Sequence, residues 1–240
     1  MSTVPARPEL PKRFYTEVSI VEEEGGFAVR LDGRPVRTPS RALLRVPSRA
    51  VADEIAREWD AQETHIDPAT MPMTRLANTV LDGVVADAAG VAEDLGRYAE
   101  TDLLAYRAAE PQRLVDRQTQ GWDPVMDWAS RRTGQDFARG VGVMFVAQPA
   151  ASVEALREIV RAEQDPFRLA ALHQMTTLTG SLLLALAVAE GFLDVERAWT
   201  LAHIDEDWNI EQWGEDAEAQ ARRENRFRDM RMAAIMLGRA

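Results

Sequence analysis

The sequence contains no cysteine among its 240 residues, which excludes disulfides, thiol catalysis and thiolate metal sites. Lysine is almost as scarce, since Lys12 is the only one and arginine supplies the other cationic side chains. This arginine bias, together with abundant alanine, indicates a GC-rich bacterial genome. The first residues lack the apolar stretch of a secretory signal. We therefore expect a protein of the bacterial cytoplasm.

Several functional signatures are also missing. No run of about 20 apolar residues could span a bilayer, so we expect no membrane insertion. The glycines form no phosphate-binding loop, and neither a GxSxG nor an HExxH motif occurs. The net charge of -11 and the pI of about 4.9 argue against nucleic acid or an anionic membrane as the main partner. Hydrophobic residues make up 46% of the chain, enough for a globular core.

The first part of the chain has the pattern of β-strands. Apolar and polar residues alternate through residues 13–46, and turns are expected at Gly25-Gly26 and Asp32-Gly33. This predicts an antiparallel meander. Ser48 is a candidate N-cap for a helix that ends near Gln62.

The rest of the chain has helical periodicity. The apolar stripes predict helices over residues 73–84, 91–106, 114–132 and 153–160, a helix capped by Asp194, and a last helix over 215–237. Gly90 is expected to break the pattern before the second of these. Residues 140–146 form an apolar run that predicts either a strand or a buried turn.

The sequence predicts one central helix from Asp165 to Phe192. Asp165 can cap it, and Gly191 is a natural stop. Between residues 182 and 189 nearly every side chain is apolar, so this part must be buried on all sides. Gly180 and Ser181 would let a neighbouring helix approach closely.

Together these patterns predict an α+β fold, in which a small N-terminal antiparallel β-rich domain is followed by a larger all-helical C-terminal domain. We expect residues 1–12 to form a flexible arm, residues 13–88 the β-rich domain with one or two helices, and residues 89–240 the helical domain. The chain has no long coiled-coil seam, so a monomer is expected.

The best chemical candidate is the cluster at His203, Glu206 and Asp207, which share a helix face. One histidine and two carboxylates could hold a divalent metal or support acid/base catalysis. No other part of the sequence supplies a matching ligand set, however, and metal sites are argued from a complete set. The alternative is a solvated acidic helix end.

Three other groups are weaker candidates. Asp102 lies on a partly apolar stripe, so it could be a base with a raised pKa, although pairing with a tyrosine, Arg97 or Arg107 is the more common arrangement. His65 lies in a loop with no triad partners. His173 is expected to be a satisfied core histidine.

Trp208 and Trp213 stand among acidic residues over positions 205–216. Aromatic side chains ringed by charge are typical of protein-binding patches. A tryptophan taken alone is more often part of the core, so both interpretations stay open.

A series of short motifs connects these features. They are Arg13-Phe14-Tyr15, Leu31-Asp32-Gly33-Arg34-Pro35-Val36, Glu58-Trp59-Asp60-Ala61-Gln62, Met71-Pro72-Met73-Thr74-Arg75, Gln120-Gly121-Trp122-Asp123-Pro124, Thr179-Gly180-Ser181 and Gln212-Trp213-Gly214-Glu215-Asp216. In this order they resemble the Atp12 family, the assembly chaperones of the F1 part of ATP synthase. The similarity extends over the whole chain after Lys12.

The resemblance implies a non-enzymatic chaperone without cofactors or metals. Its expected activity is to bind the unassembled F1 α subunit and prevent aggregation until that subunit pairs with β. Mitochondrial members would act in the matrix and carry a presequence, which we do not find here. The resemblance also implies that an acidic residue near the Trp-Gly motif is critical, with Glu206 the first choice. The expected client-binding residues are Asp205, Glu206, Trp208, Gln212, Trp213 and Glu215.

Overall fold

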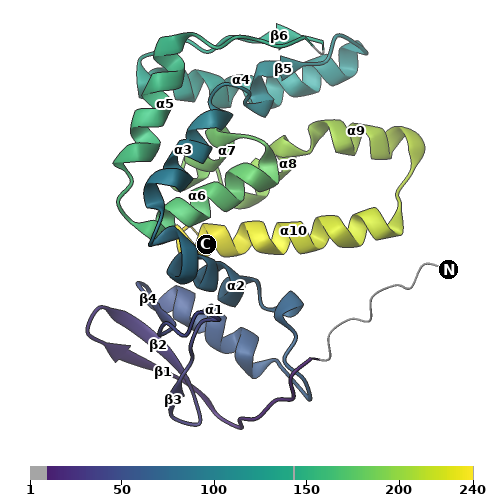
Figure 1. The fold of residues 1–240 in the computed structure, drawn as a ribbon. Helices are drawn as coiled ribbons and strands as arrows, with labels where there is room; N and C mark the ends of the chain where they lie inside the picture. The colour runs from purple at the N-terminus through teal and green to yellow at the C-terminus, as the bar shows by residue number, and fades with distance from the viewer. Residues whose placement is uncertain (1–9, 143, 240) are drawn as a thin grey trace, which may run out of the picture. The chain divides into compact units, whose positions relative to one another are not determined.

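The fold of the computed structural model is α+β, as the sequence predicts (Figure 1). The structure describes residues 10–142 and 144–239. Its described chain divides into two compact units, Met1–Asp82 and Gly83–Ala240. The first unit holds a small antiparallel sheet and the second is helical. Within these ranges no helix has the length and apolar character needed to cross a bilayer.

The sheet of the first unit is antiparallel, as predicted, but its strand order is not that of a simple meander. Its strands are β1 (Val18–Glu23), β2 (Gly26–Leu31), β3 (Arg34–Pro35) and β4 (Arg45–Val46). β2 is central and pairs antiparallel with the other three. Asp32 and Gly33 both have positive φ, at 47° and 76°, which matches the tight turn expected between β2 and β3.

The turn between β1 and β2 lies one residue earlier than predicted. Glu24 and Gly25 form it, and Gly26 is already the first residue of β2. A Cβ atom on Gly26 would lie 2.4 Å from the carbonyl oxygen of Val46. Glycine is therefore needed here for the close approach of β4.

The helices follow the sheet in the chain, and the first of them packs against it. They are α1 (Arg49–Asp60), the 3₁₀ turn η1 (Pro68–Thr70), α2 (Pro72–Thr79) and the π-helical turn η2 (Val80–Val84), which runs into the second unit. Ser48 caps α1, as predicted, by accepting a hydrogen bond from Val51 N. α1 packs against β1 and β2 through its buried apolar residues.

Glu58 connects the two main helices of this unit. Its carboxylate accepts hydrogen bonds from the backbone N–H groups of Met73 and Thr74, at 2.6 and 2.8 Å, and so caps the start of α2. Burial raises the pKa of Glu58, while these bonds act in the opposite direction. Two of the sequence motifs are thus parts of one structural contact.

Residues 1–9 of the predicted flexible arm lie outside the described residues. The part that follows is held by the loop after α1. Lys12 forms a β-bridge with His65, and Ile66 N donates to the carbonyl oxygen of Pro11 at 2.8 Å.

Nine helical segments form most of the described second unit. They are α3 (Ala88–Tyr98), the 3₁₀ turn η3 (Leu103–Ala105), α4 (Gln112–Thr133), α5 (Ala150–Ala162), α6 (Pro166–Thr179), α7 (Leu182–Ala189), α8 (Val195–Ala202), α9 (Ile204–Trp213) and α10 (Ala217–Met236). Two short parallel strands, β5 (Tyr106–Arg107) and β6 (Gly140–Val141), accompany them.

One local prediction for this unit is wrong, and one that the sequence left open is decided by the structure. The helix expected to extend to Tyr106 ends at Tyr98, and Gly90 lies inside its first turn, where its N–H donates to the Asp87 cap at 3.0 Å. The run at residues 140–146 contributes a short strand, but it is not buried. Met144 and Phe145 are 76% and 68% exposed.

The predicted central helix is two helices. Gly180 has a φ of 70° and ends α6, and the Ser181 hydroxyl then accepts from Leu184 N at 3.0 Å to begin α7. All eight residues of α7 are buried, so the expected burial is correct. Gly180 and Ser181 form the break itself, because a left-handed residue followed by an N-cap ends one helix and starts another.

The packing of α4 positions the helices that follow α7. Trp122 is fully buried, and its indole N–H donates to the carbonyl oxygen of Leu201 at 2.8 Å. A Cβ atom on Gly121 would lie 2.8 Å from Leu201 and 3.0 Å from Ile204. The absence of a side chain at this position therefore lets the junction of α8 and α9 rest against α4.

Candidate functional site

The expected client-binding residues lie on α9 and in the turn after it. Carboxylates occupy the first turn of α9, where they favour the unpaired N–H groups of a helix start. Gly214 ends α9, and Asp216 caps α10. Figure 1 shows α9 and α10 running in opposite directions on either side of that turn. Ile204 is the only buried residue of α9, so this helix hairpin is largely open to solvent.

Asp205 is an anchor rather than a free surface charge. Its carboxylate accepts a hydrogen bond from the side-chain amide of Gln118 at 2.6 Å. Gln118 is buried, and its side-chain oxygen accepts from Ala108 N at 2.7 Å. The start of α9 is therefore fixed to α4 through a buried amide.

One hollow extends from the first turn of α9, which carries Glu206, to the tip of the hairpin, which carries Trp213 and Glu215. All three residues line this hollow, which has a volume of about 200 Å³. Trp213 is 87% exposed, so the interpretation of this indole as a core residue is wrong. A large aromatic side chain held open to solvent among carboxylates is characteristic of a binding surface.

Trp208 and Gln212 occupy the adjacent side of α9. They line a second hollow of about 370 Å³ with four residues of α4 that include Arg113 and Arg117. The Arg117 guanidinium lies 5.5 Å from the centre of the Trp208 ring, within the range of a cation–π contact. Trp208 is half-buried, so it is neither a core residue nor an open one.

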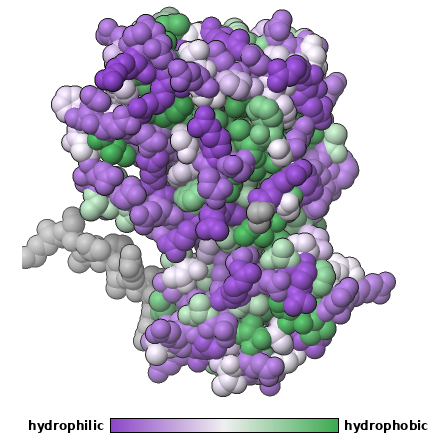
Figure 2. All heavy atoms as spheres, turned by 180° about the vertical axis from the view of Figure 1, so that it is seen from behind, coloured by the Kyte–Doolittle hydropathy of each residue, from purple (hydrophilic) through white to green (hydrophobic). Residues whose placement is uncertain are grey.

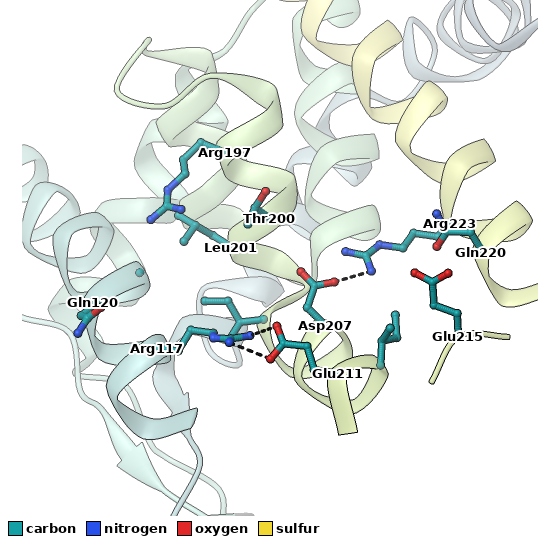
Figure 3. A pocket seen from close by; sticks show the side chains of 13 residues that line it. Arg117, Gln120, Arg197, Thr200, Leu201, Asp207, Glu211, Glu215, Gln220 and Arg223 are labelled. Carbon is teal, nitrogen blue, oxygen red and sulfur yellow. Dashed lines mark hydrogen bonds and ion pairs between the residues drawn. The ribbon is translucent and has the colours of Figure 1, made fainter. Parts of the chain in front are cut away.

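A cavity of about 600 Å³ lies between α4, α8, α9 and α10 (Figure 3). Its apolar lining comes from Leu201, Ile204 and Ile210, and charged pairs stand at its rim. Glu215 also lines it, which connects the cavity with the hollow at the hairpin tip.

Two ion pairs hold the rim of this cavity. Arg117 donates to both carboxylate oxygens of Glu211, at 2.7 and 2.9 Å, and Arg223 lies 2.5 Å from a carboxylate oxygen of Asp207. The hydrogen bond from Arg117 lowers the pKa of Glu211. Neither arginine is predictable from the sequence around α9, because Arg117 comes from α4 and Arg223 from α10. The only sequence signal for these ion pairs is the four-residue spacing of Asp207 and Glu211, which places both carboxylates on one helix face.

The metal hypothesis for His203, Glu206 and Asp207 finds no support in this geometry. Nδ1 of the buried His203 lies 2.7 Å from the carbonyl oxygen of Trp199, and Nε2 is 3.7 Å from Glu206. Burial lowers the pKa of His203. Asp207 is paired with Arg223 instead. Within residues 10–142 and 144–239, no three ligating side chains come close enough to hold a metal ion.

Asp102 is buried, but its partners differ from those expected. Its carboxylate accepts hydrogen bonds from Ser181 Oγ at 2.7 Å, Leu183 N at 3.0 Å and Leu104 N at 3.1 Å. Neither a tyrosine nor Arg97 or Arg107 binds it. Arg107 pairs with Asp123 at 2.8 Å. Asp102 therefore stabilises the start of α7, which is a structural role and not a catalytic one.

The two remaining histidines lie apart from the hairpin. His173 is not a core residue, since its side chain is 36% exposed and its Nε2 lies 2.9 Å from a carboxylate oxygen of Asp94 on α3. Its acidic partner is thus distant in sequence, which is why it was missed. His65 lies in the loop after α1, where its ring contacts the hydroxyl of Thr64.

These features define a class of two-unit α+β proteins in which an open, charge-rimmed helix hairpin is the most distinctive surface. Residues 12–130 match the model of the ATP12 chaperone protein family. The chain is 51% identical to the Atu1473 protein of Agrobacterium tumefaciens, a candidate chaperone. That crystal structure has a TM-score of 0.89, and the match covers 96% of this chain and 86% of that one.

Two further relatives carry the family name. Atp12 from Paracoccus denitrificans is 44% identical with a TM-score of 0.85, and the match covers 95% of this chain and 97% of that chain. Mitochondrial protein atp12 of Schizosaccharomyces pombe is 23% identical over 220 residues, which is 86% of this chain and 75% of the relative. This chain belongs to the ATP12 chaperone family.

Proposed function

We propose that this protein binds the unassembled α subunit of the F1 sector of ATP synthase and prevents its aggregation until it pairs with β. Membership of the ATP12 chaperone family supports this function. An unassembled subunit exposes an apolar interface that would otherwise aggregate. A chaperone that covers this interface must then release the subunit to its proper partner. This requires the partner to bind the interface more tightly than the chaperone does.

The open tip of the α9–α10 hairpin is the structural feature that supports a specific binding site. Trp213 offers a large apolar contact there, and Glu206 and Glu215 add charge beside it. Aromatic anchors with a charged rim match the composition of protein interfaces. The proposed contact surface also includes Trp208 and Gln212 on the adjacent side of α9. The function requires no catalytic group.

Glu206 is the sharpest point at which to test the surface. Its carboxylate is exposed and makes one weak contact, to His203. Its replacement should therefore change the surface without opening the core. Asp205 is a poorer choice, because its loss would leave the buried Gln118 amide without its partner.

The experiment is an aggregation assay. Purified F1 α subunit is diluted from denaturant with and without this protein, and β subunit is added afterwards. We expect reduced aggregation and then transfer of α to β. Glu206→Lys should weaken protection while the circular dichroism spectrum stays unchanged. Glu24→Lys makes the same charge change in the β1–β2 turn and should protect like the wild type.

The absence of both a complex and protection would contradict the proposed function. Normal protection by Glu206→Lys would leave the function intact and refute the assigned surface. We also propose that the protein is a bacterial cytoplasmic monomer, which sedimentation of the purified chain would check.

A further inference from the structure

A second concave surface lies wholly within the first unit, away from the α9–α10 hairpin in the sequence and on different elements. It is a cavity of about 540 Å³ beside β3. Its lining residues are Phe14, Leu31, Asp32, Arg34, Pro35, Val36, Arg37 and Trp59. The proposed function uses none of them.

The apolar side of this cavity is held in place by contacts within the first unit. Phe14, Tyr15 and Trp59 form a chain of edge-to-face ring contacts, with centroids 5.4 and 5.7 Å apart. The Tyr15 hydroxyl donates to the carbonyl oxygen of Trp59 at 2.6 Å, which fixes the cluster to α1. Phe14 is nevertheless 72% exposed. An exposed aromatic ring on a rigid support is a good anchor for a partner, because little entropy is lost on binding.

Trp59 adds its indole ring to this wall. Its buried indole N–H has no hydrogen-bond partner in the described part of the chain. Buried donors are normally paired. Because this nitrogen is shielded from solvent, Trp59 offers the cavity its ring and not a hydrogen bond.

The other side of the cavity is positively charged. From Gly33 to Ala52 the sequence has five arginines and no acidic residue, although the chain as a whole has a net charge of -11. Arg45 and Arg49 are paired with Glu23 and Asp53. The other three arginines of this stretch are exposed and make no ion pair within the described residues: Arg34, Arg37 and Arg41.

The single carboxylate among these lining residues does not neutralise the arginines. Asp32 accepts hydrogen bonds from Thr16 N at 3.1 Å and Glu17 N at 2.9 Å, which lower its pKa. It is thus satisfied by backbone donors. Arg37 donates to the carbonyl oxygen of Arg41 at 2.8 Å, so the two guanidinium-bearing residues remain close together beside an apolar hollow.

We propose that this cavity and its arginine rim bind an acidic protein segment that carries a bulky apolar side chain. The apolar side chain enters between Phe14, Trp59 and Val36, and flanking carboxylates meet Arg34 and Arg37. Charge complementarity selects an acidic segment, because guanidinium groups without partners bind carboxylates well. The concave shape favours a side chain over a lipid surface. The inference does not depend on which protein the chaperone protects.

The test is fluorescence anisotropy with the full chain and a labelled peptide that has a central tryptophan flanked by aspartate and glutamate. Two control peptides replace the acids by lysine or the tryptophan by serine. We expect saturable binding of the first peptide only, weakened by added salt. Phe14→Ala and the double variant Arg34→Glu, Arg37→Glu should each reduce affinity by about tenfold or more.

Arg49→Glu is the matched control, since this arginine belongs to the same stretch but pairs with Asp53 outside the cavity. It should bind the acidic peptide like the wild type. Circular dichroism checks that each variant is folded. Equal binding of the acidic and lysine peptides would overturn the proposal. So would unchanged binding by the Phe14 and arginine variants, or binding of phosphatidylglycerol vesicles without binding of the peptide.

Discussion

At the scale of single residues, Asp102 is the most deeply buried carboxyl group in the described part of the chain. It is 3% exposed, and burial raises its pKa to about 6 despite three hydrogen-bond donors around it. The ordinary value is 3.8. The folded state therefore binds the proton more tightly than the unfolded state. The stabilisation from protonation is complete below the unfolded pKa and is lost as pH rises through about 6.

Asp102→Asn should remove this dependence. The unfolding free energy of the wild type minus that of the variant is expected to fall by about 2 kcal/mol between pH 4 and pH 7. Urea denaturation across this range measures the difference. Glu24→Gln controls for the loss of one exposed negative charge. A constant difference between wild type and variant would show that Asp102 does not titrate in this range.

Two tryptophans, Trp122 and Trp213, differ completely in burial, which their residue type does not reveal. Trp122 is fully buried, whereas Trp213 is 87% exposed. Trp122→Ala should cost about 3–5 kcal/mol of unfolding free energy, because it leaves a cavity in the core. Trp213→Ala should change stability by less than about 0.5 kcal/mol, yet weaken protection of the F1 α subunit. Thermal unfolding and the aggregation assay separate these effects, and a large loss of stability in Trp213→Ala would contradict the assignment.

At the scale of secondary-structure elements, the break between α6 and α7 is the main departure from the sequence-based expectation. Apolar residues recur on both sides of the break, at Leu178 and Leu182, so periodicity alone predicts one helix. A single backbone angle at Gly180 redirects the chain. The Ser181 cap and the buried Asp102 carboxylate then satisfy the N–H groups at the new helix start. Asp102 is 79 residues away in the sequence from Ser181, so this partnership was not predictable.

Gly180→Ala should therefore destabilise the protein by about 1–2 kcal/mol, because an alanine in the left-handed region is strained. The cost comes from the backbone, since the new Cβ would meet only Leu103 at 3.8 Å. Gly83→Ala is the control, because Gly83 lacks positive φ and has open space around its Cβ position. Urea denaturation of both variants provides the comparison. Equal stabilities would mean that α6 and α7 tolerate a continuous helix.

At the scale of the whole molecule, the acidic surface shapes how partners are recognised. On the face drawn in Figure 2, hydrophilic residues cover most of the surface and hydrophobic ones gather in smaller patches. Acidic residues outnumber basic ones, 39 to 28, which gives the net charge of -11. The two proposed protein-binding surfaces differ in sign. The hairpin tip carries carboxylates beside Trp213, and the cavity of the first unit carries arginines beside Phe14.

Salt should distinguish charge from apolar contact at the hairpin. The screening length falls to about 3 Å at 1 M salt. The loss of protection in Glu206→Lys is therefore expected to shrink as NaCl is raised, whereas the loss in Trp213→Ala should persist. Aggregation assays at low and high salt, each referred to the wild type under the same conditions, measure both effects. A salt-independent defect in Glu206→Lys would indicate a local structural change.

The sequence by itself determined the fold class, most helix positions, the Ser48 and Asp194 caps and the family. These depend on local periodicity, turn residues and motif order, which a single chain displays directly. Tertiary structure alone decided which charges are paired and which aromatic rings are open. Asp205 with Gln118, Arg117 with Glu211 and Asp94 with His173 join helices distant in the chain. Burial and pairing depend on these long-range contacts, which no local pattern of residues specifies.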